Sequence, residues 1–250
     1  MELGHITSHL MLVGLSERKH RRTKVTGTFL LAGKPLLNTN NGINMQTEIT
    51  IEQAKRVLEV IDAGLCRGVG KPKLGHMCVE AAVCYGLDLP FGDNPQCVNP
   101  VVRAFKIRLN DARWSSNAAR AKGMRAVGIA QLGSNGTIDS VAFGKKLAEL
   151  TIRRIVSTAL RATAKKVSKH HSTTLILAAE KCEKEGTLEA ALSARTAAYA
   201  DAAYAAADAA YAAAARDTIL EASAQCAVDA LRFVNAPGIK LMDELILEVK

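Results

Sequence analysis

The chain has 250 residues, of which 48% are hydrophobic, 23% charged and 4% aromatic, and its formal net charge is +9. This composition is ordinary for a globular protein with one large or two modest domains, apart from the low aromatic content and an excess of alanine. Six irregularly spaced cysteines exclude a disulfide framework and predict a reducing, cytoplasmic setting, and no apolar run reaches the length of a membrane span.

The first 47 residues differ from the rest. A basic block, Arg18–Arg22, follows a short apolar run, which is the wrong order for a signal peptide. Residues 24–42 contain β-branched residues, a Gly-Lys-Pro turn signal and an Asn-rich end. They predict either a short β-hairpin or a mobile extension, and both interpretations stay open.

Helix signals then recur along the chain, beginning with a capping box formed by Thr50 and Gln53. The expected helices run from Thr50 to Gly64, from Pro100 after its N-cap Asn99, from Ser115 or Ser116 to about Gln131, and from about Asp139 to Lys166. These elements predict an all-α fold, either a multi-helix bundle or a helical array.

The stretch from Ala63 to Leu87 holds the most chemistry, since glycines, a histidine and three cysteines lie between two helical segments. Pro72 and Gly75 break helices, so the next helix is expected from about His76, with Cys78 in its first turn. The positive end of a helix dipole favours a thiolate there, whereas the apolar neighbours favour an inert, buried thiol. A phosphate-binding P-loop is excluded because Gly70 and Lys71 are followed by Pro72.

Two catalytic interpretations of this stretch remain. Cys78, followed by Glu80, resembles the first half of a zinc-deaminase signature, but the second half is displaced around Cys97 and lacks a partner cysteine. A thiol enzyme would use Cys78 as nucleophile with His76 and Glu80 handling protons, although Cys78 is rotated by about 200° from both on an ideal helix. The candidate zinc ligands are His76, Cys78, Cys84 and Cys97, at spacings that match no common zinc finger.

Charge is unevenly distributed. Residues 98–170 contain 15 Lys and Arg against 3 Asp and Glu, whereas residues 171–250 contain 7 against 12. This asymmetry predicts either an anionic partner for the middle of the chain or electrostatic contact between its two parts. The residues assigned to a basic face that would bind nucleic acid or an acidic protein are Arg103, Lys106, Arg120, Arg125, Arg153, Arg154 and Arg161.

Alanine occupies 17 of the 26 residues from 190 to 215. Tyr204 and Tyr211 share one helical face there, which predicts an arm of an intramolecular hairpin or a seam between two copies of the chain. The expected organisation is an N-terminal extension (1–47), a basic helical domain (48–170) and an alanine-rich helical hairpin packed on it (171–250).

Two blocks, LCRGVGKPKLGHMCVEAAVCYGLDLPFGDNPQCV and FKIRLNDARWSSNAARAKGMRAVGIAQLGS, resemble an uncharacterised group of proteins from tailed bacteriophages and mobile elements. The resemblance covers the chain from about residue 48 and brings no activity with it. It implies an accessory role in the cytoplasm of a bacterial host. The leading hypothesis is therefore a non-catalytic interaction protein without a cofactor, and the alternative is a cysteine- or zinc-dependent enzyme centred on residues 76–97.

Overall fold

The computed structural model describes residues 48–165, 167–199 and 212–247, and within these ranges the fold is all-α, as predicted. The expected N-terminal hairpin, Tyr204 and Tyr211 lie outside the described residues. The helices are α2 (Ile51–Asp62), α3 (Val79–Gly86), α4 (Pro100–Asn110), α5 (Asn117–Ala130), α6 (Ser140–Leu150), η1 (Thr151–Val156), α7 (Ser157–Ala164), α8 (Lys169–Glu185), α9 (Leu188–Tyr199), α10 (Ala212–Phe233), α11 (Gly238–Met242) and η3 (Asp243–Leu247). None of the helices in these ranges is both long and apolar enough to cross a bilayer.

Four of the predicted helix starts are confirmed, because the predicted capping side chains accept hydrogen bonds from the first turn of each helix. The Thr50 hydroxyl accepts from Gln53 N–H while the Gln53 side chain accepts from Thr50 N–H. The side chains of Asn99, Ser116 and Asp139 cap α4, α5 and α6 in the same way.

One predicted start is wrong by three residues. The helix expected from His76 begins at Val79, and Cys78 is its N-cap. Met77 and Cys78 bond to the preceding loop instead, because Met77 C=O accepts from Cys66 N–H and Val69 C=O accepts from Cys78 N–H. These loop hydrogen bonds hold residues 77 and 78 out of the helix.

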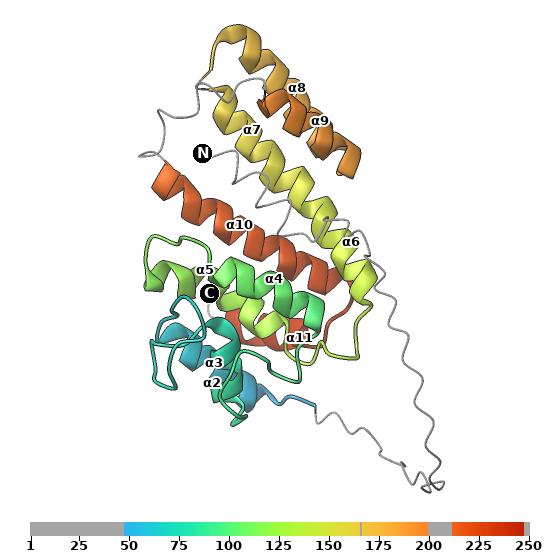
Figure 1. Ribbon diagram of the computed structural model, residues 1–250. Coiled ribbons are helices and arrows are strands. Elements are labelled where there is room, and N and C mark those ends of the chain that lie inside the picture. The colour runs from blue at the N-terminus through green and yellow to red at the C-terminus, as the bar shows by residue number, and fades with distance from the viewer. Residues whose placement is uncertain (1–47, 166, 200–211, 248–250) are drawn as a thin grey trace, which may run out of the picture.

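The main core joins α2, α3, α4, α5, α10 and α11, with the inner face of α6 against it (Figure 1). Two glycines set how closely the elements pack. A Cβ on Gly86 would lie 2.7 Å from Val57 Cα, and one on Gly238 would lie 2.5 Å from Ile129 O. The backbones of α3 and α11 therefore approach α2 and α5 at distances that only glycine permits.

A second, smaller core forms an arm at one end of the molecule. The helix predicted from Asp139 to Lys166 is a continuous rod made of α6, the π-helical turn η1 and α7, and its outer half packs against α8 and α9 (Figure 1). The residues of this second core are Ile152, Val156, Leu160, Ala164, Leu175, Ala179, Cys182, Ala190, Ala191 and Ala194. The two cores thus divide the chain within η1 rather than at residue 170, and α10 returns to the main core.

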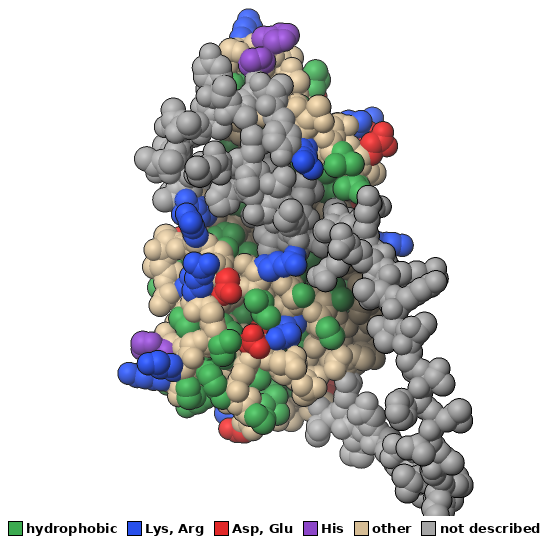
Figure 2. All heavy atoms as spheres, viewed as in Figure 1, with side chains coloured by type: hydrophobic (Ala, Val, Ile, Leu, Met, Phe, Trp, Pro, Cys, Tyr) green, Lys and Arg blue, Asp and Glu red, His purple; other side chains and the backbone are tan. Residues whose placement is uncertain are grey.

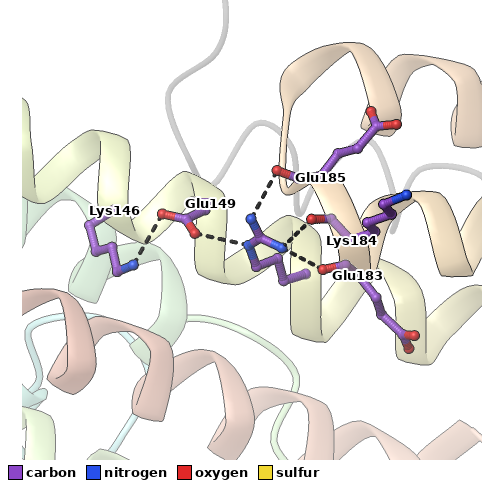
Figure 3. Close-up of polar contacts among 6 residues, drawn as sticks. Lys146, Glu149, Glu183, Lys184 and Glu185 are labelled. Atoms are coloured by element: carbon purple, nitrogen blue, oxygen red, sulfur yellow. Dashed lines mark hydrogen bonds and ion pairs between the residues drawn. The ribbon is translucent and has the colours of Figure 1, made fainter.

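Arg153, in η1, joins the rod to the arm. Its guanidinium donates to the C=O groups of Glu183, Lys184 and Glu185, the last three residues of α8, and to the carboxylate of Glu149 (Figure 3). These carbonyls have no partner within α8, so Arg153 is the C-terminal cap of that helix.

Candidate functional site

The glycine-rich segment 64–77, hereafter the cationic loop, is held against the main core by polar side chains of α4 and α5. Asp111 accepts from Gly68 N–H (2.8 Å), the Asn110 amide donates to Cys66 C=O (3.0 Å), and the Arg120 guanidinium donates to Leu65 C=O (3.2 Å). These bonds fix the inner edge of the loop. Its outer edge is left to solvent.

Glycine is required at one position of this loop on two grounds. Gly70 has φ of +77°, in the left-handed region, and a Cβ there would lie 1.9 Å from His76 O. Lys71 N–H donates to the same carbonyl (2.8 Å), so the loop folds tightly back on itself. The loop is therefore a shaped platform rather than a loose connection.

The outer edge of the loop carries uncompensated positive charge. Arg67, Lys71 and Lys73 are exposed, and no ion pair of theirs occurs among the described residues. The sequence contains no Asp or Glu between Asp62 and Glu80. Figure 2 shows Lys, Arg and His side chains together over the segment between α2 and α3.

Cys78 lies beneath this loop and is buried. Its Sγ accepts from Ala81 N–H (3.3 Å), so it caps α3 as a serine would. Burial raises the pKa of the Cys78 thiol to about 11, which outweighs the hydrogen bonds from the backbone of Ala81 and Glu80 that favour the thiolate. At neutral pH the side chain is a protonated thiol.

Glu80 and Lys106 form an ion pair inside the core. Lys106 Nζ lies 3.3 Å from Glu80 Oε1, both side chains are 0% exposed, and Gln131 donates to Glu80 Oε2 at 3.3 Å. Burial raises the pKa of the Glu80 carboxyl and lowers that of the Lys106 ammonium, while their mutual attraction opposes both shifts. Each group depends on the other to remain charged.

The three catalytic candidates do not converge. Cys78 and Glu80 line one small cavity of about 80 Å³ with Asp93 and Asn110, whereas His76 is on the exposed side of the loop and is not part of its wall. Glu80 is already engaged by Lys106 and Gln131. Among the described residues, the hydrogen bonds to the Cys78 sulfur come from backbone N–H groups and not from a histidine or carboxylate that could activate the thiol.

The candidate zinc ligands differ in burial and do not form a recognisable metal site among the described residues. His76 is exposed, Cys78 and Cys84 are buried, and Cys97 is half-buried. In the part of the chain that the structure describes, no three His, Cys, Asp or Glu side chains are grouped so that they could hold a metal ion.

Each of the seven basic residues assigned from the sequence has an intramolecular partner. In the main body, Arg103 pairs with Asp93, Lys106 with Glu80 and Arg125 with Asp62, and Arg120 donates to the carbonyls of Leu65 and Asn110. In the arm, Arg153 pairs with Glu149, Arg154 with Asp229 and Arg161 with Glu183.

Two of these arm pairs join the basic middle of the chain to its acidic C-terminal part. Asp229 lies on α10 and Glu183 on α8, both beyond residue 170. Electrostatic contact between the two parts, one of the two explanations for the charge asymmetry, therefore occurs within the molecule. Basic residues that the sequence did not single out, in the cationic loop, remain open to a partner.

Comparison with protein-family models, with curated proteins and with solved structures finds no match to this chain.

Proposed function

We propose that this chain is a non-catalytic protein that binds nucleic acid through the cationic loop. The single observation that carries the proposal is the acid-free outer edge of a fixed loop, where Arg67, Lys71 and Lys73 are exposed and form no ion pair with any residue that the structure describes. When clustered Lys and Arg side chains neutralise phosphates, the counterions condensed on the nucleic acid are released, and this release drives sequence-independent binding.

The exposed side chains favour contact with the nucleic-acid backbone over contact with bases. Apart from Tyr85, Phe91 and Phe233, the large apolar side chains exposed among the described residues are aliphatic, so stacking platforms for bases are few. Arg113, two residues after the loop anchor Asp111, is exposed and adds a fourth cation beside the loop. Phosphate contacts of this kind position a protein on a duplex without reading its sequence.

A second basic group, with two lysines and a histidine, lies where α7 meets α8, at the tip of the arm. Lys165, Lys169 and His170 are exposed there, and the sequence contains no Asp or Glu between Glu149 and Glu180. Figure 2 shows Lys and His side chains at this end of the molecule. A long anionic polymer can therefore meet positive charge at both ends of the protein, whereas a small acidic ligand cannot.

The test replaces Arg67, Lys71 and Lys73 together by alanine and measures the affinity for a fluorescent 20-base-pair duplex by anisotropy at low salt. We expect a loss of affinity of at least tenfold, because each cation removed takes one phosphate contact with it. The matched control replaces Lys55, Lys145 and Lys240, three exposed lysines without ion pairs among the described residues, and has the same net charge.

If both triple variants lose affinity equally, binding follows net charge and not the loop, and the proposal is wrong. It is equally wrong if the wild-type protein does not bind the duplex at low salt. The resemblance to proteins of tailed bacteriophages and mobile elements supports, as part of the same proposal, an accessory role on phage or plasmid DNA.

A further inference from the structure

A groove opens beside the cationic loop, between the end of α2 and the first half of α5. It encloses about 480 Å³, a size within the usual range for small-molecule sites of roughly 300–1,000 Å³. Its floor consists of small residues, namely Ala63, Gly64, Gly75, Ala118 and Ala121. Because these side chains are small, a ligand can approach the backbone closely.

The two glycines that line the groove are the first residue of the cationic loop, Gly64, and Gly75, two residues before its end. Both have positive φ, +114° at Gly64 and +76° at Gly75, and a Cβ on Gly64 would lie 3.5 Å from Gly75 Cα. The loop therefore leaves and rejoins the body at the groove. Any strand held by the loop passes next to it.

One wall of the groove carries an arginine held in a fixed orientation. Asp62 binds Arg125 with two hydrogen bonds, from Nε to Oδ1 (2.8 Å) and from Nη2 to Oδ2 (3.2 Å). A guanidinium has five N–H donors, so the Nη1 edge of Arg125 remains available. Because the carboxylate already sets the plane of the guanidinium, little side-chain entropy is lost when this edge binds an anion.

A lysine adds a mobile positive charge at the rim. Lys122 is 79% exposed and lies 3.4 Å from Glu221, which is an exposed pair of the kind that contributes little to stability. Lys122 can leave Glu221 for a ligand at small cost. Asn117, at the start of α5, also lines the groove; its Oδ1 accepts from Arg120 Nη1 (2.6 Å), and its NH2 group can donate to a ligand.

From these features we infer that the groove binds a phosphorylated nucleoside, with the phosphate between Arg125 and Lys122 and the base on the alanine floor. The choice of a nucleotide over other phosphorylated molecules rests on the proposed function, because the groove adjoins the loop that would hold a nucleic acid. The nucleotide can be free or can be the 5′ end of a strand.

The experiment titrates the full chain with adenosine 5′-monophosphate, with adenosine and with a 5′-phosphorylated hexanucleotide, each followed by calorimetry. We expect saturable binding of the monophosphate and at least tenfold weaker binding of adenosine. Tighter binding of the hexanucleotide identifies a strand end as the source, and binding of the monophosphate alone identifies a free nucleotide.

Two variants localise the binding. Ala118→Trp fills the groove from an exposed position of α5 and should weaken monophosphate binding at least tenfold, whereas Ala162→Trp, at an exposed position of α7, should not. Lys122→Ala should weaken it by a smaller factor and leave adenosine unaffected. The inference is overturned if the wild type does not bind the monophosphate saturably, or if Ala118→Trp binds it as the wild type does.

The same variants separate this inference from the proposed function. Ala118→Trp should keep the salt-dependent affinity for the duplex, which the cationic loop supplies. If the duplex binds through the loop while the monophosphate does not bind, only the groove assignment fails. If the monophosphate binds through the groove while the duplex does not bind, only the proposed function fails.

Discussion

The buried pair of Glu80 and Lys106 gives the sharpest prediction about stability. Replacing Glu80 by Gln leaves the Lys106 ammonium in the core without its counter-charge, since the two atoms are 3.3 Å apart and both side chains are 0% exposed. Breaking a buried pair in this way costs about 3–5 kcal/mol, a large part of the roughly 5–15 kcal/mol that stabilises a typical domain. Replacing both residues, as Glu80→Gln with Lys106→Met, removes both buried charges and should cost at least 2 kcal/mol less than Glu80→Gln alone.

The assay is urea unfolding followed by circular dichroism, applied to the wild type, both single variants and the double variant. In Glu80→Gln, burial still lowers the pKa of Lys106 and no carboxylate opposes it, so the unfolded state binds more protons than the folded state below the ordinary lysine pKa of about 10.4. The free energy of unfolding of this variant should therefore rise as the pH is raised through the alkaline range to about 10.4, the ordinary lysine pKa. Single variants as stable as the double variant, with no such pH dependence, would refute the reasoning.

Three further predictions concern packing, capping and reactivity. Gly86→Ala should destabilise the folded protein by about 1–3 kcal/mol, because the new Cβ would meet the Val57 backbone. Gly144→Ala, where a Cβ meets nothing within 4 Å, should stabilise it by about 0.5–1 kcal/mol. Thermal unfolding measures both effects, and equal effects would contradict the packing described. Arg153→Lys keeps the positive charge but loses the planar guanidinium that donates to the last three carbonyls of α8. Amide hydrogen exchange at the C-terminal end of α8 should therefore accelerate, while exchange in α2 should not change. Equal acceleration in both helices would show that the substitution destabilises the whole fold and not this helix end. Cys78, with its pKa raised by burial to about 11, should resist alkylation by iodoacetamide at pH 7, as measured by mass spectrometry of the folded protein; rapid labelling would contradict its protonated, buried state.

The helical architecture could be predicted because the signals that specify it are local. A capping box at Thr50 and Asn99 before Pro100 act within one turn of helix, so a single sequence contains all that is needed to recognise them. The start of α3 was misplaced because the hydrogen bond from Cys66 N–H to Met77 C=O that delays it joins residues eleven apart, which no local pattern shows.

The basic residues show why the site was harder to predict. A helical projection places Arg154 and Arg161 on the polar face of a rod but cannot show that Asp229 and Glu183 lie opposite them. The sequence around Lys106 is typical of a surface lysine, and only the structure shows that Lys106 pairs with Glu80 in the core. The sequence itself does contain one signal for the cationic loop, namely the run without Asp or Glu from residue 63 to residue 79.

The measurement that tests the central claim most directly is the salt dependence of duplex binding by the wild type and by the variant without Arg67, Lys71 and Lys73. Each phosphate neutralised contributes about −0.9 to the slope of log K against log salt concentration, so the loop variant should have a slope less steep by about 2–3. The control variant without Lys55, Lys145 and Lys240 should keep the wild-type slope. Equal slopes for the wild type and the loop variant would contradict the account, because they would show that the cationic loop does not contact phosphate.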